Sequence, residues 1–471
     1  MRSVTTSLLL LVLLGISPLR AEVSFMRDIA PVLQQRCTGC HGAKKAKGNY
    51  RLHTFEYLKE AIVSGEPEES DLYLLLVEED AESRMPQDDD ALSPTDTELI
   101  RQWIEGGATF DGENPSKSFA SQAFPRTHPS PPAVYRVPVP IMAMAYSNDG
   151  VELAVAGHHE VTIWDPESGS LLRRLSGLPL RIQSMSWTPR GGQLVIGGGT
   201  AGEYGELALI DAMTGERLKV FDTFEDLVLG IGLDKQGKQL AAVSADRTGR
   251  AYDLESGKRL WTSNVHSDWA TSVSFSPDNC FIISTSKDQT VKVLNATDGA
   301  LFTTFNGHRR NFGDFPGRFK VFAGCFDPAS GLAMSVGEGK AIRIWDPIKV
   351  KEENGTAGDM EQRFFKAGHT RYISHGFSGP TFALAVDADS VYTGGSDGLI
   401  RAFEFTSGKQ RLEMSGHQDW IYTLTLSRAT KRLATGAHDG EVRVWDTQDG
   451  TLIESFMAAP GYPVREDTSS D

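Results

Sequence analysis

A strand pattern that recurs through most of the chain constrains the fold more than any other sequence feature. Seven short segments alternate apolar and polar residues and close on an aromatic or apolar residue, then usually an acid (161–165, 207–211, 250–253, 291–295, 342–346, 401–404 and 442–446). Most lie about 42 to 46 residues apart, which is the length of a four-stranded propeller blade, and two intervals are longer through insertions. The pattern predicts an all-β, seven-bladed propeller over residues 134–460, followed by a flexible tail at 461–471.

Several of these units hold polar residues that can satisfy one another's hydrogen bonds. The last unit offers an imidazole, a hydroxyl, a carboxylate and an indole in His417, Thr435, Asp439 and Trp445. Two other units hold part of this set: His369, Thr393 and Asp397 with Phe403, and His266, Ser284 and Asp288 with Leu294. Buried together, such groups fix strand register without leaving orphan donors. We therefore interpret them as structural rather than catalytic.

Three units close on the dipeptide Trp-Asp, at Trp164-Asp165, Trp345-Asp346 and Trp445-Asp446. With these dipeptides the repeats resemble the WD-repeat family. The resemblance implies a rigid platform that binds a protein or polymer partner, so function is to be sought in loops that are longer than the repeat requires.

Two such loops each follow a Gly-His pair and are rich in arginine and aromatic residues, which are typical interface anchors. Both are expected to lead into an innermost strand and to emerge on one face, beside two tryptophans at matching places in their own units. The candidate partner-binding residues are Trp269, Arg309, Arg310, Phe312, Arg318, Arg371, Tyr372 and Trp420. The alternative is that the loop aromatics pack beneath their own blades.

A different motif, Cys37-Thr38-Gly39-Cys40-His41, lies near the amino terminus. Two thiols with two residues between them, followed by an imidazole, are what covalent attachment of haem c needs, and His41 then coordinates the iron. A zinc site would require a second ligand pair, but Cys280 and Cys325 lie far away in the sequence. These two cysteines are expected to be small buried hydrophobic residues rather than a disulfide. A thioredoxin-like dithiol would require a βαβ setting, whereas the flanking pattern is helical.

Helical patterns lie on both sides of this motif. Phe25, Ile29 and Leu33 recur at intervals of four and predict an amphipathic helix ahead of Cys37. A second helix is predicted after Ser93, which can cap it, and the apolar residues of this helix end at Gly106-Gly107. A small all-α cytochrome c domain is built on such a terminal helix pair, and we place it at residues 22–110.

Three residues of this domain are candidates for the second iron ligand. Met85 precedes a proline in the loop before the last helix, and Pro86 would hold the backbone extended there. Met85 is the predicted ligand, which gives a His/Met iron of comparatively high potential. His53 is the alternative and would lower the potential, whereas Met26 lies within the first helix and is poorly placed.

Five segments in order, 28–33, 37–42, 84–86, 92–93 and 103–108, resemble the planctomycete-type cytochrome c domain. The resemblance implies one covalently attached haem c, with Cys37 and Cys40 as the thioether residues, His41 proximal and Met85 distal. The chain departs from the family after Pro86, where Gln87 and three aspartates replace the Pro and Gly that often follow.

The amino terminus predicts export. Arg2, an apolar run at 8–16 and the exit segment 17–21 have the layout of a signal peptide over residues 1–21, and an uncleaved anchor is the alternative. No later segment is apolar enough to suggest an integral membrane helix, so a periplasmic or cell-envelope location is expected. Export agrees with the haem motif, since bacteria attach haem c outside the cytoplasm.

The formal net charge of -15 disfavours nucleic acid as a partner. Acidic residues crowd 66–90, and a solvated face is the default interpretation of them. Because the last run, 88–90, adjoins the loop of Met85, we also hypothesise that this run steers a basic redox partner protein toward the haem. Residues 111–133 are rich in proline and polar residues and predict an extended linker.

The leading interpretation is an exported monohaem cytochrome that carries single electrons, with a propeller that selects its partner. The alternatives are a redox enzyme whose propeller holds a second cofactor, and a haem-based sensor or scaffold.

Overall fold

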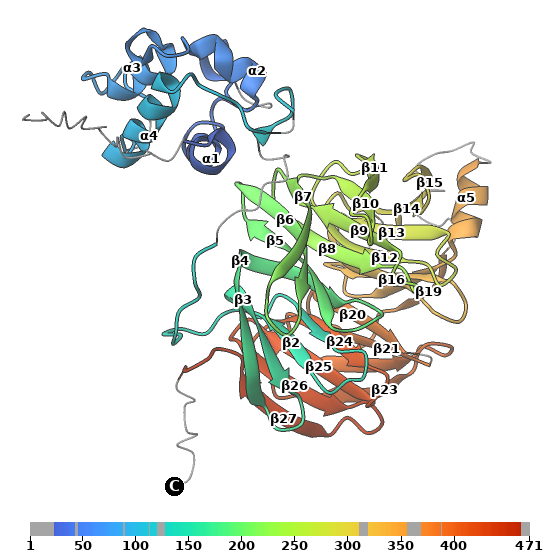
Figure 1. Cartoon of the computed structure of the whole chain (residues 1–471). Coiled ribbons are helices and arrows are strands. Elements are labelled where there is room, and N and C mark those ends of the chain that lie inside the picture. Colours follow the sequence, from blue (N-terminus) through green and yellow to red (C-terminus); the bar gives the residue numbers. More distant parts are fainter. Residues whose placement is uncertain are drawn as a thin grey trace, which may run out of the picture. The chain divides into compact units, whose positions relative to one another are not determined.

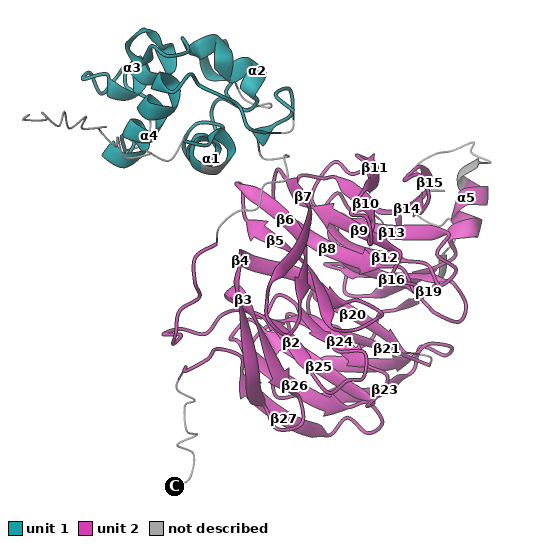
Figure 2. Ribbon diagram, in the orientation of Figure 1, with its two compact units in different colours: residues 1–119 teal, residues 120–471 magenta. Residues whose placement is uncertain are grey.

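The computed structural model describes residues 23–42, 46–87, 90–112, 114–119, 128–309, 319–355, 369–387 and 389–462. The chain divides into two compact units, Met1–Phe119 and Ala120–Asp471 (Figure 2). The predicted signal peptide at 1–21 lies outside the described residues. Within the described ranges, every helix is too short or too polar to cross a bilayer.

The regular elements described in the first unit are all helical (Figure 1). They are η1 (Phe25–Ile29), α1 (Ala30–Arg36), η2 (Lys47–Asn49), α2 (Phe55–Leu58), η3 (Lys59–Ala61), η4 (Pro67–Glu69), α3 (Asp71–Val77) and α4 (Pro94–Glu105). The predicted helix pair is present, because η1 and α1 form the first helical segment and α4 the last. Ser93 caps α4 as expected, and its hydroxyl accepts a hydrogen bond from the Asp96 amide at 3.0 Å.

The core of this unit lies between the two ends of its sequence. Phe25, Ile29 and Leu33 are fully buried, as their spacing predicts. The Phe25 ring lies 5.1 Å from the Trp103 ring on α4. Apolar packing thus joins the first helical segment to the last and frames the loops between them.

The first unit continues past the predicted boundary at residue 110. Phe119 is 1% exposed and its ring lies 5.0 Å from that of Phe25. The Phe119 amide donates to the His53 carbonyl at 3.0 Å, and Ser118 pairs with Thr54 in an isolated bridge. The segment expected to begin the linker at 111 therefore belongs to the helical unit. Although most of its residues are polar, burial of the Phe119 ring stabilises its contact with the core.

The second unit is built of antiparallel strands. The first seven, β1 (Met144–Tyr146), β2 (Leu153–Ala156), β3 (His158–Asp165), β4 (Ser170–Trp187), β5 (Gln193–Thr200), β6 (Tyr204–Asp211) and β7 (Arg217–Phe224), form one sheet. β4 has 18 residues and ends one four-stranded group while it begins the next. We call each group of four strands a blade.

Five further four-stranded blades follow in sequence order. The third is β8 (Val228–Leu233), β9 (Gln239–Ser244), β10 (Gly249–Asp253) and β11 (Arg259–Ser263), and the fourth is β12 (Ala270–Phe275), β13 (Phe281–Ser286), β14 (Val291–Asn295) and β15 (Leu301–Phe305). The fifth comprises β16 (Val321–Phe326), β17 (Ala333–Gly337), β18 (Ile342–Trp345) and β19 (His369–Ile373), with η6 (Gly307–Arg309) before it and α5 (Pro347–Gly355) within it. The sixth is β20 (Thr381–Asp387), β21 (Ser390–Gly395), β22 (Ile400–Glu404) and β23 (Gln410–Met414), and the seventh is β24 (Ile421–Ser427), β25 (Arg432–Ala437), β26 (Glu441–Asp446) and β27 (Leu452–Met457).

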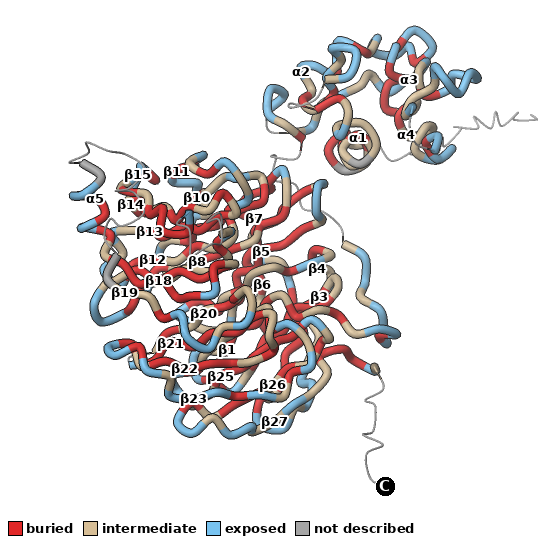
Figure 3. The backbone as a smooth tube through the Cα atoms, turned by 180° about the vertical axis from the view of Figure 1, so that it is seen from behind, coloured by how far each residue is buried: buried red, intermediate tan, exposed pale blue. Residues whose placement is uncertain are grey.

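The first strands of successive blades contact one another in the order β1, β4, β8, β12, β16, β20 and β24, and β24 contacts β1 again. The strands of this unit are largely buried, whereas many of the turns between them are exposed (Figure 3). A closed succession of twisted antiparallel sheets is consistent with a β-propeller. Each of the seven predicted repeat segments is the third strand of a blade.

The succession closes by packing and not by exchange of a strand, since β27 pairs with β26 of its own blade. The Ile141 amide donates to the Ala437 carbonyl at 3.0 Å, and the Tyr135 amide donates to the Pro460 carbonyl at 3.1 Å. The Trp164 ring stacks on the Phe456 ring at 4.6 Å. Both the last strand and the segment near Tyr135 therefore contribute to closure. Of the predicted tail, residues 461–462 are described and 463–471 are not.

The end of the predicted linker is bound to the first two blades. His128 Nε2 lies 3.0 Å from a carboxylate oxygen of Glu206, whose side chain is fully buried. Arg174 donates to the Pro132 and Ala133 carbonyls at 2.6 and 3.0 Å. Residues 128–133 thus belong to the second unit, which corrects the predicted linker 111–133 at this end as well.

The polar network predicted for the last blade is present, with one change. Thr435 is its centre, because its hydroxyl accepts from Trp445 Nε1 at 2.9 Å and lies 2.7 Å from His417 Nε2. The second ring nitrogen of His417 faces Glu441, at 3.2 Å, in place of the predicted Asp439. In the fourth blade His266 contacts Asp288 and Ser284 at 2.9 and 3.0 Å, as predicted.

The predicted role of His369 is wrong. His369 lies in β19, where it pairs with Trp345, and therefore belongs to the outermost strand of the fifth blade. His417 and His266 each lie four residues before an innermost strand, and the residue at that place in the sixth blade is Phe377, whose ring lies 5.6 Å from Phe403. An aromatic pair thus replaces the imidazole and indole in this blade.

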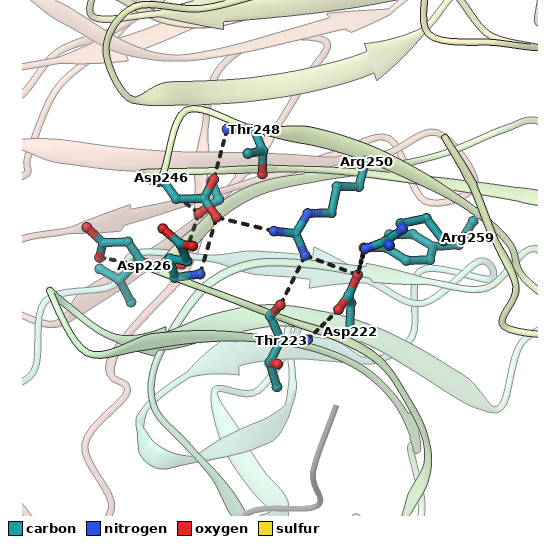
Figure 4. A network of polar contacts seen from close by, with 11 residues as sticks. Asp222, Thr223, Asp226, Asp246, Thr248, Arg250 and Arg259 are labelled. Atoms are coloured by element: carbon teal, nitrogen blue, oxygen red, sulfur yellow. Dashed lines mark hydrogen bonds and ion pairs between the residues drawn. The ribbon is translucent and has the colours of Figure 1, made fainter. Parts of the chain in front are cut away.

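The third blade, whose sequence repeat is degenerate, is stabilised by a different network (Figure 4). Arg250, with a side chain only 7% exposed, pairs with Asp222 at 3.0 Å and with Asp246 at 3.4 Å. The hydroxyl of Tyr252, at the tryptophan place of the repeat, donates to Asp222 at 2.9 Å. Because Asp222 lies in β7 and Arg250 in β10, this network joins the second blade to the third.

None of the four cysteines is in a disulfide. Cys325 is half-buried and packs against the apolar core of the fifth and sixth blades, and burial raises the pKa of its thiol to about 12. Cys280 is exposed, which corrects the expectation that both are buried. It lies in the turn between β12 and β13, where its amide donates to Asp278.

Candidate functional site

The Cys-x-x-Cys-His motif forms a tight turn directly after α1. Cys37 is the C-cap of the helix, where its amide makes the last helical hydrogen bond, to the Leu33 carbonyl at 2.9 Å, and the Cys40 and His41 amides both donate back to the Cys37 carbonyl. A Cβ atom on Gly42 would lie 2.4 Å from the Thr38 carbonyl oxygen. The turn therefore requires glycine directly after the histidine, which explains the residue that follows the motif.

This turn borders a cavity of about 590 Å³. Its lining brings together both thiols of the motif, the imidazole and the predicted methionine ligand, with apolar side chains from α3. The lining residues are Arg36, Cys37, Gly39, Cys40, His41, Lys47, Gly48, Tyr50, Leu52, Leu72, Leu75, Leu76, Met85, Pro86 and Gln87. The four residues predicted to hold haem thus lie around one cavity, although Met85 is far from the motif in sequence.

The imidazole of His41 is 8% exposed and is oriented by backbone. Its Nδ1 lies 3.0 Å from the Tyr50 carbonyl oxygen. A carbonyl can only accept, so Nδ1 carries the proton and Nε2 is left with its lone pair. A metal-binding histidine commonly has its other nitrogen bonded in this way. Tyr50 was not predicted, because it contributes a carbonyl group, for which no side chain gives a signal.

Met85 is fixed by the end of α3. Its amide donates to the Leu75 carbonyl at 2.8 Å, which satisfies one of the acceptors left over at the helix end. Leu72 and Leu76 of the same helix are 4% and 6% exposed and form the apolar wall beside it. The other two sulfur or imidazole donors considered, His53 and Met26, do not line the cavity within the described residues.

Two ionisable groups of the cavity wall, the Cys37 thiol and the Tyr50 phenol, are held in their neutral forms. Burial raises the pKa of the Cys37 thiol to about 11, against the opposing effect of Arg36. Burial, together with Asp71 and Cys37, raises the pKa of Tyr50 to about 12. The cavity therefore presents neutral donors in an apolar wall, which suits a large planar apolar group. No group of three or more His, Cys, Asp or Glu that could hold a metal ion occurs in the described ranges.

The second candidate site is the propeller face around the starts of the innermost strands. In six of these strands one residue bulges out of register at the same position. The bulged residues are Gln183, Leu229, Thr271, Phe322, Phe382 and Tyr422. A bulge changes the direction in which the bulged side chain points. Here the bulge occurs at the same position of the innermost strand in six blades.

Aromatic residues occupy this position in three successive blades and contact one another. The Phe382 ring lies 5.4 Å from Phe322, 5.3 Å from Tyr422 and 5.8 Å from Trp420. We call these four residues the aromatic row. Trp420 is 48% exposed, so the row reaches solvent. Of the aromatic row, only Trp420 was predicted. The other three are each the second residue of an innermost strand, a recurrence that an alignment of these strands would show.

The remaining predicted partner residues are dispersed. Trp269 is 39% exposed and the Lys287 ammonium lies 3.5 Å from its ring centre, while Arg309 donates to the Asp288 carbonyl at 3.2 Å. Arg310, Phe312 and Arg318 lie outside the described residues. Arg371 and Tyr372 lie in β19, not in a loop before an innermost strand, which corrects their expected placement.

The side chains of Arg371 and Tyr372 both contact other residues of the second unit. The Arg371 guanidinium lies 4.9 Å from the Phe405 ring centre and donates to the Thr406 carbonyl of the next blade. The ring centre of Tyr372 lies 5.5 Å from the guanidinium of the buried Arg343. The contacts of Arg371 join the fifth blade to the sixth, whereas the contact of Tyr372 lies within the fifth blade.

Comparison with known proteins supports both resemblances. Residues 37–89 match the family model described as Planctomycete cytochrome C, a span that includes the Cys-x-x-Cys-His motif and Met85. Residues 257–295 and 408–446 match the model described as WD domain, G-beta repeat. These two spans contain the His266 and His417 networks. Each span begins just before the outermost strand of one blade and ends at the third strand of the next.

Similar curated proteins align with about half of the chain. Apoptotic protease-activating factor 1 of Danio rerio is 24% identical over 260 residues, which cover 49% of this chain and 20% of that protein. Serine-threonine kinase receptor-associated protein of Mus musculus is 23% identical over 262 residues, which cover 50% of this chain and 71% of that protein. U3 small nucleolar RNA-associated protein 15 homolog of Xenopus tropicalis is 23% identical over 243 residues, 51% of this chain and 42% of that protein.

Proposed function

We propose that the first unit binds one haem c covalently and exchanges single electrons, and that the second unit, a seven-bladed WD-repeat propeller, selects the protein with which it does so. The observation that carries the proposal is the single cavity around which Cys37, Cys40, His41 and Met85 converge. The match of residues 37–89 to a cytochrome family supports it.

Each residue has a defined task in this proposal. Cys37 and Cys40 hold the macrocycle through thioether bonds, and His41 offers Nε2 because Tyr50 engages Nδ1. Met85 offers its sulfur from a backbone position fixed by Leu75. The leucines of α3 exclude water from the cavity. When bound, haem c supplies a one-electron iron couple, and a His/Met pair sets its potential comparatively high.

The redox partner is proposed to be a basic protein. The described acidic residues between positions 66 and 90 are all exposed, and they are Glu66, Glu68, Glu69, Asp71, Glu78, Glu79, Asp80, Glu82 and Asp90. Exposed charges of one sign accelerate association with an oppositely charged partner and are screened by salt. The rate of electron exchange with a cationic partner should therefore fall as ionic strength rises.

The aromatic row is the proposed docking face of the propeller. WD repeats are a protein-interaction scaffold, and exposed aromatic residues are typical interface anchors. In keeping with the signal-like amino terminus, we place the protein in the periplasm or cell envelope of a bacterium.

The test is a redox titration of the full chain made in a host that matures c-type cytochromes. The proposal requires one haem per chain, a c-type spectrum and a single one-electron wave. A second chromophore would favour the enzyme alternative instead. Partner binding that changes with the oxidation state of the haem would favour the sensor. Absence of any haem from the exported chain would refute the proposed electron carrier and leave the propeller platform alone.

A further inference from the structure

A second cavity, of about 390 Å³, lies in the propeller beside the starts of three successive innermost strands. It is lined by Val139, Pro140, Met142, Ala156, Gly157, His158, Arg181, Ile182, Gln183, Tyr422 and His438. The first three precede β1, His158 begins β3, and Arg181 lies within β4. The cavity is large enough for a small organic molecule.

The ionisable lining of this cavity is basic or neutral. It consists of Arg181, His158, His438 and Tyr422, and no carboxylate lines it among the described residues. The carboxylates that interact with this lining, Asp419 and Glu160, lie outside it and each already has a hydrogen-bond partner. Asp419 lies 3.0 Å from His438 Nδ1, and Glu160 is bound by Tyr135 at 2.5 Å and by Arg174 at 2.6 Å.

Arg181 is the strongest candidate anchor. Its side chain is exposed and takes part in no hydrogen bond or ion pair with any residue that the structure describes. A guanidinium is charged at every physiological pH and offers a planar fork that matches a carboxylate. In a protein with a net charge of -15, a permanent cation without a partner in a concave site is available for an anion.

The cavity is built where the chain departs from its own repeat. In the last blade Gly416-His417 precede the innermost strand, but the same place in the second blade holds Gly177 and the fully buried Leu178, within the continuous strand β4. This continuity pairs His158 with Arg181 across β3 and β4. The basic lining thus arises from a local change that a regular blade does not need.

We infer that this cavity binds a compact organic carboxylate. Arg181 would hold the carboxylate, with the His158 and His438 rings close by. Met142 and Ile182 form an apolar wall for the body of the ligand, and the ring of Tyr422 offers a surface for stacking. A carboxylate suits the site better than a phosphate, because one permanent cation balances a single negative charge.

The test uses the full chain and three probes that share a phenyl ring, which are benzoate, phenyl phosphate and neutral benzamide. Binding is followed by ligand-observed NMR titration at low and high salt. Benzoate is expected to bind saturably and at least tenfold more tightly than benzamide. Arg181→Gln should weaken the binding of benzoate at least tenfold, and Arg181→Lys should weaken this binding less. Arg190→Gln, which removes an exposed arginine outside this cavity, should change the affinity for benzoate less than twofold.

Three results would overturn the inference. One is the failure of benzoate to bind at millimolar concentration, or equal binding of benzamide. Another is binding that Arg181→Gln leaves unchanged. The third is tighter binding of phenyl phosphate than of benzoate, which would replace the carboxylate by a phosphate ligand. Because Arg181 is exposed, its variants should fold, and circular dichroism of each variant verifies this. The probes bind the propeller, so their failure leaves the proposed haem function untouched.

Discussion

Replacement of Thr435 by valine tests whether the polar network of the last blade is structural. Thr435 is fully buried, and its hydroxyl contacts Trp445 Nε1 at 2.9 Å and His417 Nε2 at 2.7 Å. Valine has nearly the same shape, so the change removes one oxygen and leaves two buried nitrogens without this partner. Each stranded group costs about 1–3 kcal/mol, so the pair is expected to cost at least about 2 kcal/mol.

Hydrogen exchange measured by mass spectrometry reports this loss locally. A cost of at least about 2 kcal/mol corresponds to exchange at least about 30-fold faster for the protected amides of β25 and β26. Amides of β13 and β14 in the fourth blade should exchange at the original rate. The haem spectrum should not change, since the network belongs to the propeller.

Two variants of the same blade serve as controls. Thr423→Val makes the identical change in β24, at a side chain that forms no hydrogen bond with the described residues, and should alter exchange less than threefold. Asp439→Ala should loosen the blade less than Thr435→Val does, because Asp439 accepts only from the Glu441 amide in the contacts described. If Thr435→Val behaved like Thr423→Val, or if it altered haem ligation, the structural role assigned to this network would be refuted.

Three further variants test other parts of the molecule. Gly42→Ala places a methyl group 2.4 Å from the Thr38 carbonyl oxygen and should lower the haem content of the purified chain, measured by absorbance after alkaline pyridine treatment. Met85→Ala should keep the haem covalently attached but abolish sulfur ligation and lower the midpoint potential in a redox titration. Burial is the largest single effect on Asp288 and raises its pKa, but the hydrogen bonds from His266, Thr290 and the Ser267 amide, together with the charge of His266, outweigh burial and hold the pKa well below its usual value. The stability contributed by Asp288 is therefore complete above about pH 4 and lost as the pH falls further, so in urea unfolding Asp288→Asn should cost more at pH 7 than at pH 3.

Matched controls make these outcomes decisive. Gly39→Ala lies in the same turn, and an added Cβ there meets nothing within 4 Å, so haem content should be retained. Met26→Ala removes a buried sulfur outside the cavity and should leave the potential unchanged. Equal effects of the two methionine variants would contradict the role proposed for Met85, and a pH-independent effect of Asp288→Asn would contradict the role of its carboxylate.

The sequence predicted those features that local spacing encodes. Cys37, Cys40 and His41 are close in sequence, the apolar period of η1 and α1 is regular, and the third strands of the seven blades repeat at similar intervals except at two insertions. Met85 could be linked to the motif only through its place before the last helix and through resemblance to a family, yet the structure brings it to the same cavity.

The features that were missed depend on contacts distant in sequence. Tyr50 orients His41 through a backbone carbonyl, and Phe119 joins the first core from a polar segment. His369 follows a glycine as the repeat requires, but an insertion shifts the frame, so that Phe377 takes the place predicted for it. Composition and motif matching cannot detect a shift of this kind, because only strand pairing fixes the register.

The central claim is that haem is bonded to this chain through Cys37 and Cys40, and the intact mass of the denatured protein tests it most directly. The full chain should be produced in a host competent for cytochrome c maturation, then unfolded in acid and analysed beside the Cys37→Ser/Cys40→Ser variant. The account predicts that the unfolded chain retains the mass of one haem and that the variant lacks it. A chain without added mass, or haem that separates on unfolding, would contradict the account.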